Sequence, residues 1–228
     1  MRVACFILVG VLMALPAQAA EFKVHRSDSI ELIVSMTGML ESGDSKKLQR
    51  ILRSNPFAQQ KFLKLNSTGG WVQAALEVGI IVRFYGIQTV IPKNALCISA
   101  CSMVFVAGWD DKRFAPARYK HLEGHLGVHR PYIENFQAAD PAVLEAVRSY
   151  LAYMKAGDQF YALTIATSPR QIRLIEISEL KAMGDYKVLG LSKAQKVRKP
   201  RKKPPQYSRA RTQRELERWR RSLLESSD

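Results

Sequence analysis

Cysteine is scarce in this chain, and its scarcity limits the chemistry that the chain can support. The 228 residues include three cysteines and four histidines. No second Cys/His pair stands at ligand spacing from Cys97 and Cys101, although a structural metal site needs about four such ligands. The sequence therefore argues against a metal centre, and we expect no cofactor.

The N-terminus also lacks an apolar run of the length typical of a transmembrane helix. Arg2 is followed by an apolar run over residues 3–15 and then by small residues around Ala17 and Ala19. This order is typical of a secretory signal peptide, cleaved here before Ala20. An uncleaved anchor is the alternative, but the run is short against a span of roughly 20 residues. We therefore expect residues 1–19 to be removed and the mature protein to be secreted, or periplasmic in a bacterium.

Cleavage would leave Cys97 and Cys101 as the two thiols of the mature chain, in a compartment where disulfides persist. They stand four residues apart, and a disulfide requires Cα atoms within about 7 Å of each other. Two interpretations stay open at this point. One is a disulfide that joins the two cysteines flanking Ser99, and the other is a pair of small buried side chains.

Acidic residues are absent from residues 193–214, which hold ten Lys and Arg together with prolines. Residues 192–228 contribute +9 to the formal net charge of +15. Such a segment cannot bury enough apolar surface to fold alone, so we predict a basic linker over 192–211. Thr212 and Glu215 have capping-box spacing and predict an amphipathic helix over 212–228. After export, an anionic membrane surface or an acidic partner fits this tail better than nucleic acid does.

The segment between these ends, residues 20–191, has the length of one domain. Its strands and helices alternate, which predicts βαβ units and a parallel sheet covered on both faces. We expect a short linker before residue 30, and a polar loop over residues 118–127. The predicted strands are 30–36, 62–65, 87–91 and 186–189, with a short one near 126–131. The predicted helices are 44–52, 71–85, 99–108, 140–156, 159–166 and 178–183.

The turns that leave parallel strands gather on one edge of the sheet. This rule brings the Gly69-Gly70 turn to the segment from Cys97 to Gly108, whose sequence is Cys-Ile-Ser-Ala-Cys-Ser-Met-Val-Phe-Val-Ala-Gly. Acyl transfer needs a hydroxyl beside a base and two backbone N–H groups aimed at the developing oxyanion. Glycines permit the required turn, and a helix that opens near Ser99 presents free N–H groups. We therefore interpret this edge as a candidate active site.

Three motifs stand on this framework in order. They are Leu65-Asn-Ser-Thr-Gly-Gly70, the segment from Cys97 to Gly108, and Gly127-Val-His-Arg-Pro131, with Arg113 between the last two. Together they resemble the Clp protease proteolytic subunit, in the branch of exported Clp-like and crotonase-fold serine proteases. The resemblance covers about Glu31 to Leu189. It implies a ClpP/crotonase-like α/β fold, a serine peptidase acting on a peptide or protein substrate, and assembly into oligomers.

The resemblance also implies roles for individual residues. Ungapped alignment from Gly108 places Ser99 on the nucleophile of the family, and Ser102 lies three residues into the helix. His129 corresponds to the general base, a role suited to a side chain that titrates near neutral pH. The N–H groups of Gly70 and Ala100 are the expected oxyanion donors. Among the other histidines, we expect His121 and His125 to be solvated or to line a substrate path.

The third member of the catalytic triad is missing from the sequence. The family has an acid at the position of Ile172, and this chain has none there. Glu176, Asp158 and Asp185 are substitutes within sequence reach, although each is more simply a surface charge. Disabling the acid of a triad costs about 10⁴ in turnover, so a slow Ser99/His129 dyad and an inactive descendant both fit the sequence.

Other mechanisms and functions remain open. A Ser/Lys dyad is a second mechanism on the same fold, and Lys93 and Lys112 are the nearest lysines in sequence. Crotonase relatives act on acyl-CoA thioesters, which an exported protein rarely meets. From a different functional class, an inactive Clp-like domain could hold a peptide beside its sheet edge as a binding module.

Overall fold

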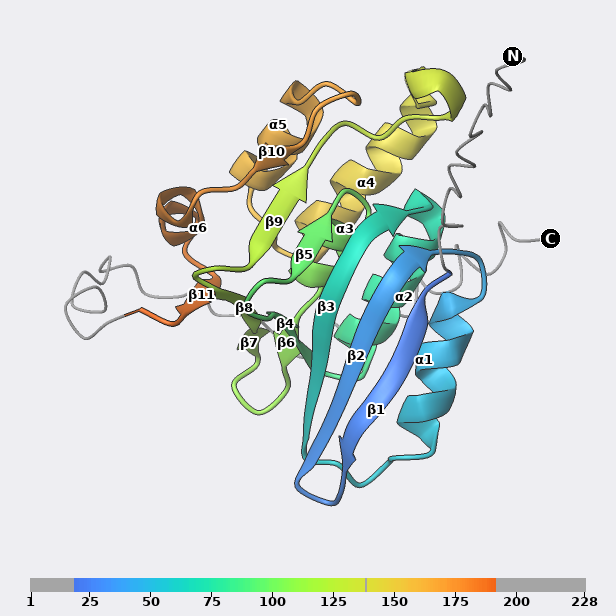
Figure 1. The fold of residues 1–228 in the computed structure, drawn as a ribbon, viewed down its shortest axis with the longest axis vertical. Coiled ribbons are helices and arrows are strands. Elements are labelled where there is room, and N and C mark those ends of the chain that lie inside the picture. Colours follow the sequence, from blue (N-terminus) through green and yellow to red (C-terminus); the bar gives the residue numbers. More distant parts are fainter. Residues whose placement is uncertain (1–18, 138, 192–228) are drawn as a thin grey trace, which may run out of the picture.

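The computed structural model describes residues 19–137 and 139–191 (Figure 1). Its strands are β1 (Glu21–Ser27), β2 (Glu31–Leu40), β3 (Gln60–Gly70), β4 (Ile87–Ile91), β5 (Leu96–Ile98), β6 (Trp109–Asp110), β7 (Ala115–Pro116), β8 (Arg118–His121), β9 (His125–Val128), β10 (Arg173–Leu174) and β11 (Tyr186–Leu189). Its α-helices are α1 (Asp44–Arg53), α2 (Val72–Phe84), α3 (Cys101–Val106), α4 (Pro141–Tyr153), α5 (Asp158–Ala166) and α6 (Ile177–Met183). The basic linker and the terminal helix expected over 192–228, and the signal peptide up to residue 18, lie outside the described residues.

Nine of the described strands form one sheet that divides along β3. On one side, β3 pairs in parallel with β2 over almost its whole length. On the other side, the first half of β3 pairs with β4 and its second half with β5. One branch continues from β4 to β8 and β11, and the other from β5 to β9 and β10. The expected parallel α/β fold is confirmed, and its division into two branches places β5 between β3 and β9.

The helices bury one face of the long strands (Figure 1). In β2 and β3, buried residues alternate with more exposed ones, which is the pattern of strands with one covered face. Leu63 and Leu65 point into the core, whereas Lys64 and Thr68 are exposed. The expectation of a sheet covered on both faces is therefore wrong for these strands. Their polar alternate residues keep the second face in water.

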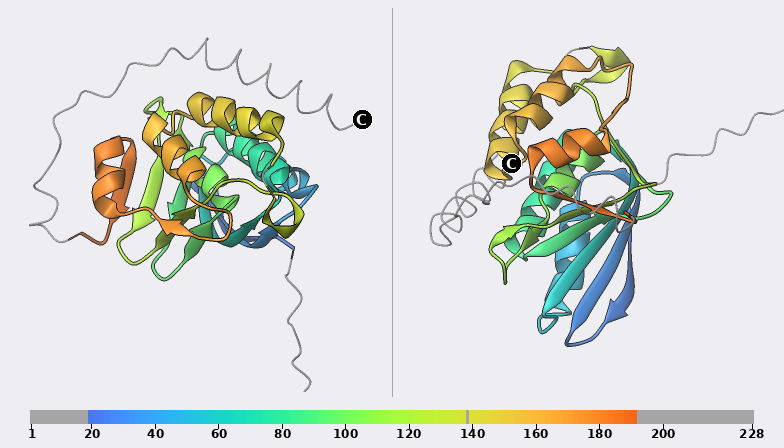
Figure 2. Two further views of the ribbon diagram at one scale, coloured as in Figure 1. Left: turned by 90° about the horizontal axis from the view of Figure 1, so that it is seen from above. Right: turned by 90° about the vertical axis from the view of Figure 1, so that its left-hand side faces the viewer.

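Helix α3 lies at the centre of the molecule, and all six of its residues are buried. It packs against α2, which in turn packs against α1. Helices α4 and α5 lie beyond α2 and α3 (Figure 2). Tyr150 of α4 reaches inward between them, because Gly79 leaves room for its hydroxyl, which donates to the Met103 carbonyl at 2.8 Å. The apolar character of α3 on all sides is thus explained by burial.

Two expectations about irregular segments are wrong. The segment before residue 30 is not a linker, because β1 pairs antiparallel with β2. The segment over 118–127 is not a polar loop, because it forms β8 and the start of β9. Arg118 and Lys120 are buried in β8, so polar residues that suggest a loop in the sequence in fact face the interior.

Helix boundaries also differ in detail from the prediction. Asp44 is the first residue of α1 rather than its cap, and its carboxylate accepts the Glu41 N–H at 2.8 Å. Helix α3 begins at Cys101, two residues after Ser99. Asp140 does cap α4, accepting the Ala142 N–H at 2.7 Å, with a proline at the next position as predicted.

Candidate active site

Ser99 occupies a sharp turn between a strand and a buried helix. β5 ends at Ile98, α3 begins at Cys101, and Ser99 between them has a φ of 58°. Few non-glycine residues adopt this left-handed conformation, and it is held here by a 3.0 Å hydrogen bond from the Ser99 N–H to the Gly127 carbonyl. A strained turn of this kind projects a serine hydroxyl away from the sheet, as nucleophilic serines require.

A disulfide spans the same turn. Cys97 in β5 and Cys101 at the start of α3 are joined, with 2.07 Å between the sulfurs and 5.1 Å between the Cα atoms. Both residues are fully buried. The bond therefore links the strand before Ser99 directly to the helix after it, and it limits how far the turn can open.

Gly69 lies directly against Ser99. A Cβ placed on Gly69 would come within 2.7 Å of the Ser99 Cβ and 3.1 Å of its Oγ, and Gly69 has a φ of 117°. Gly70 approaches a different neighbour, since a Cβ there would collide with the backbone of Leu40 in β2. The two glycines thus allow β3 to pass close to Ser99 on one side and to β2 on the other.

The two serines of this segment differ in burial and in hydrogen bonding. Within residues 19–137 and 139–191, no hydrogen bond uses the N–H of Ala100, which stands beside the Ser99 side chain at the start of the turn into α3. Ser102 is fully buried, and its N–H and its hydroxyl both donate to the Ser99 carbonyl, at 2.9 and 2.6 Å. Ser102 is therefore engaged inside the helix, and Ser99 is the serine at the surface of the turn.

His129 follows β9, the parallel neighbour of β5. Ile98 pairs with Gly127, so Ser99 and His129 both leave the carboxyl ends of adjacent strands. His129 is 8 % exposed, and its Nδ1 lies 2.9 Å from the Arg130 carbonyl oxygen. A carbonyl only accepts, so Nδ1 carries the proton and Nε2 is the basic nitrogen. In the described part of the chain no hydrogen bond joins Ser99 Oγ to His129.

The strand register shows why the missing acid matters. β10 pairs antiparallel with β9, with Arg173 opposite Val128 and Leu174 opposite Gly127. Extending this register by one residue would set Ile172 opposite His129, although the paired residues end at Arg173 and Val128. The Ile172 side chain instead covers the Cα of Gly127.

Two of the three substitute carboxylates lie at the starts of helices. Glu176 caps α6 together with Glu179, and Asp158 belongs to the first turn of α5. None of Glu176, Asp158 and Asp185 forms a hydrogen bond or ion pair with His129 among the residues that the structure describes. Among the described residues, no carboxylate therefore extends the Ser99/His129 dyad to a triad.

The two lysines considered for a Ser/Lys dyad point to other partners. Lys93 pairs with Glu123 at 3.2 Å, and the Lys112 ammonium donates to the Gln59 side chain at 3.2 Å. His121, the last residue of β8, accepts a hydrogen bond from the Glu123 N–H. His125 is exposed at the start of β9. Across the described ranges, no group of three or more His, Cys, Asp or Glu side chains is placed to hold a metal ion.

Sequence reasoning missed an aromatic cluster beside His129. The Tyr132 ring lies 5.4 Å from the imidazole, and the Phe136 ring lies 4.9 Å from Tyr132 on its other side. Tyr132 and Phe136 are each more than 40 % exposed. The signal in the sequence is only two aromatics within seven residues of His129, a spacing that indicates nothing until the loop conformation is known.

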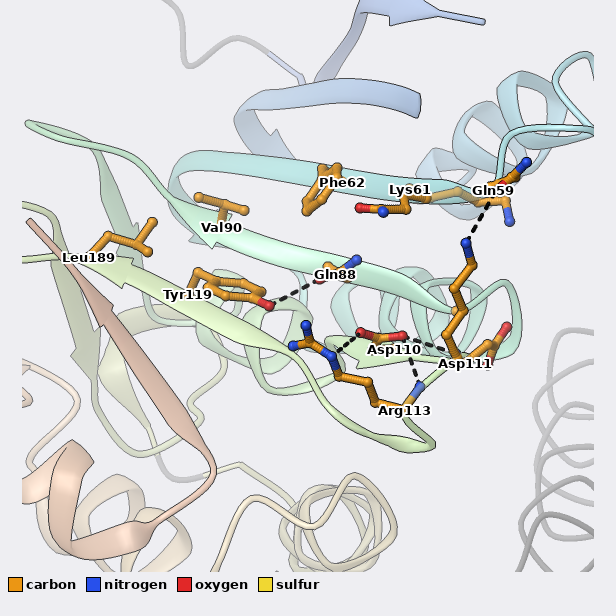
Figure 3. Close-up of a pocket in the computed structure, with 13 residues that line it drawn as sticks. Gln59, Lys61, Phe62, Gln88, Val90, Asp110, Asp111, Arg113, Tyr119 and Leu189 are labelled. Atoms are coloured by element: carbon orange, nitrogen blue, oxygen red, sulfur yellow. Dashed lines mark hydrogen bonds and ion pairs between the residues drawn. The ribbon is translucent and has the colours of Figure 1, made fainter. Parts of the chain in front are cut away.

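A concave region lies far from Ser99. It has a volume of about 410 Å³ and is lined by residues at the start of β3, by β4 and β8, and by the turn between β6 and β7 (Figure 3). Phe62, Gln88 and Tyr119 form its floor, and Asp110 and Arg113 its rim. Phe62 and Gly69 stand seven residues apart on β3, or roughly 23 Å at about 3.3 Å per residue. This region is therefore separate from the Ser99 turn.

Compared with known proteins, the sequence matches no family model and no curated protein. Its fold does match solved structures. One is a serine-to-alanine mutant of a protein named 1510-N membrane-bound stomatin-specific protease; it superposes with a TM-score of 0.53 and 14 % identity, over 72 % of this chain and 80 % of that one. At this identity the likeness shows the fold alone, which is an α/β fold that a protease also has. No described helix has the length and apolar character needed to cross a membrane.

Proposed function

We propose that this protein is an exported Clp-like serine peptidase that uses Ser99 as nucleophile and His129 as general base. The observation that carries the proposal is the strained turn at Ser99. This turn follows β5, packs against Gly69 of β3 and lies beside β9, the strand that leads to His129. A serine that only capped a helix would need neither the left-handed backbone nor a glycine in the neighbouring strand at the point of contact.

The chemistry follows from the hydrogen-bonding capacities of these groups. Ser99 Oγ adds to the carbonyl carbon of a peptide bond, and His129 Nε2 takes the hydroxyl proton. The N–H groups of Gly70 and Ala100 stabilise the oxyanion that forms. The imidazolium then returns the proton to the leaving amine, and the C–N bond breaks to give an ester on Ser99. Water, deprotonated by Nε2, hydrolyses that ester and releases Ser99.

The lack of a carboxylate at Ile172 sets the expected rate. The Arg130 carbonyl holds the correct tautomer of His129, but it is neutral and offers no charge to balance an imidazolium. We therefore expect turnover well below that of a complete triad. The alternative function is an inactive Clp-like module that binds a peptide or protein partner and is tethered to an anionic surface by the basic tail.

A fluorophosphonate probe separates these two functions, because it reacts covalently with an activated serine. We expect the purified protein to be labelled, Ser99→Ala to abolish labelling and His129→Ala to slow it strongly. Ser102→Ala serves as the matched control and should be labelled at a rate near that of the wild type. A folded wild-type protein that resists labelling would contradict the peptidase proposal and favour the binding module.

A further inference from the structure

A stack of rings extends outward from His129. The imidazole and the Tyr132 ring have centroids 5.4 Å apart and planes inclined by 37°. Tyr132 and Phe136 follow at 4.9 Å and 30°, and the guanidinium of Arg170 lies over Phe136 at 5.6 Å. His129 is almost fully buried, whereas Tyr132 beside it is 41 % exposed.

This stack stands where the proposed mechanism lacks a group. When His129 takes the proton of Ser99, its ring becomes a cation in a nearly buried position, and such a cation needs a compensating negative charge or dipole. No carboxylate bonds to it among the described residues, and the Nδ1–H partner is a neutral carbonyl. The face of an aromatic ring carries partial negative charge and attracts a cation whose centre lies within about 6 Å of its centroid. The Tyr132 ring centroid lies 5.4 Å from the imidazole centroid, which is within that distance.

We propose that Tyr132 is a positioning residue that orients the His129 imidazole and stabilises its protonated form through the face of the phenol ring, in place of a carboxylate. The proposal rests on the proposed function of Ser99 and His129. It assigns the effect to the ring and not to the hydroxyl, because the ring is the part of Tyr132 that contacts the imidazole.

The loop conformation supports this assignment independently. Asn135 and Phe136 are consecutive non-glycine residues with positive φ, 56° and 59°. A bulky side chain rarely adopts that conformation, and strain of this kind persists only where the surrounding structure requires it. Its effect here is to place the Phe136 ring against Tyr132, which fixes the orientation of Tyr132 toward His129.

The charged groups on the elements around His129 are directed elsewhere. The Arg130 guanidinium donates to a carbonyl of α5 at 2.7 Å. Arg173 of β10 pairs with Glu179 at 2.5 Å. Arg170 is separated from the imidazole by two rings and is exposed, so solvent ions screen it at physiological salt. Besides these, the titratable group nearest the imidazole in the stack is the Tyr132 phenol itself.

The first test compares fluorophosphonate labelling rates of three variants of the full protein. Tyr132→Leu removes the ring, Tyr132→Phe keeps it, and Phe84→Leu is the control at a site of equal exposure, 41 %, on α2. We expect Tyr132→Leu to slow labelling by about 3- to 30-fold, the range given by measured cation–π energies. Tyr132→Phe and Phe84→Leu should stay within about twofold of the wild type. Equal slowing by Leu and Phe would assign the effect to the hydroxyl and overturn the proposal.

A second readout does not depend on activity, so it separates failure of this proposal from failure of the proposed function. The imidazole C–H signals of His129, identified by their loss in His129→Ala, are followed by NMR against pH. We expect the protonation midpoint to move to lower pH in Tyr132→Leu and to stay in place in Tyr132→Phe, whether or not Ser99 reacts with the probe. Identical titration curves in all variants would overturn the proposal.

Discussion

At the scale of single residues, the site depends on one contact between two strands. Gly69 and Ser99 both have positive φ, and they meet where β3 passes the turn after β5. Gly69 also donates its N–H to the Ser67 hydroxyl at 3.1 Å, which shapes the end of β3. The position of the Ser99 hydroxyl is thus set by a backbone that has no room for a side chain beside it.

Gly69→Ala should therefore impair Ser99 more than it impairs folding. The new methyl group would meet the Ser99 Cβ at 2.7 Å, so Ser99 must shift. A positive φ in a non-glycine residue costs about 1–2 kcal/mol in addition. Gly157→Ala is the matched control, because Gly157 has a φ of 89° and open space around its Cα. We expect urea denaturation to show destabilisation of both variants, and labelling to drop at least tenfold in Gly69→Ala alone; equal labelling would contradict this account.

Ile172→Asp tests the register that places this residue opposite His129. A carboxylate there would accept the Nδ1–H and balance the imidazolium, and disabling such an acid in a triad costs about 10⁴. Partial recovery of that factor predicts faster fluorophosphonate labelling, by at least tenfold. Leu174→Asp adds the same charge two residues away at similar exposure, 42 % against 46 %, and should leave the rate within about twofold. Equal acceleration by both would indicate a general charge effect and contradict the register.

These residues differ in how far the sequence could identify them. Ser99 and Ile172 are assigned through the resemblance to the Clp family, which matches their positions in the sequence to those of the nucleophile and the acid. Tyr132 and Phe136 are not, because their stacking depends on two left-handed residues that are not glycine. The sequence signal for a positive φ is glycine, so a loop that reaches this conformation without one cannot be anticipated.

At the scale of elements, buried cations cap the carboxyl end of α4. The guanidinium groups of Arg83 and Arg118 both donate to the Met154 carbonyl, and Arg118 donates also to Lys155. Unpaired carbonyls and the helix dipole make this end partly negative, which offsets the cost of burying two cations. Polar residues in β8 are thus part of the buried core, and this explains why the sequence of that segment suggests a loop.

The sequence did not indicate β1 for the opposite reason. Nearly all residues of β1 are exposed, so the strand lacks the alternation of buried apolar residues that marks a strand in a sequence.

Two tyrosines packed in the same region predict a loss of stability at alkaline pH. Burial raises the pKa of Tyr150, and burial likewise raises the pKa of Tyr186, whose hydroxyl donates to the Ala156 carbonyl at 2.9 Å. A raised folded-state pKa means that these groups stabilise the fold fully below about pH 10, the unfolded value, and progressively less above it. Each should lower the free energy of unfolding by about 1.4 kcal/mol per pH unit above pH 10. Burial lowers the pKa of Lys120 from its usual value of 10.5. The contribution of Lys120 to stability therefore rises with pH, and this rise is complete near pH 10.5.

Urea denaturation between about pH 10 and 12 measures this slope. Tyr150→Phe and Tyr186→Phe should each remove roughly half of the decline, after a constant loss of about 1 kcal/mol for the deleted hydrogen bond. The double variant should show little alkaline decline. A slope unchanged by both substitutions would mean that other groups control alkaline unfolding.

At the scale of the whole molecule, the described residues separate three surfaces. The Ser99 turn lies at the carboxyl end of β3, the concave region of Figure 3 lies near its start, and the chain leaves β11 beside that region, since Leu189 is part of its lining. β11 runs parallel to β8, β4 and β3, so its carboxyl end at Leu189 points the same way as the end of β3 near Ser99.

Charge predicts how that tail behaves at a membrane. Residues 192–228 carry +9, and each Lys or Arg near an anionic surface contributes about 1 kcal/mol of attraction. We expect the protein to sediment with anionic phospholipid vesicles at low salt, and a variant that ends at Leu191 to stay in solution. Binding should fall steeply as salt rises, because the Debye length shrinks from about 10 Å at 0.1 M to about 3 Å at 1 M. Equal binding to neutral vesicles at high salt would contradict an electrostatic tether and assign the attachment to apolar side chains.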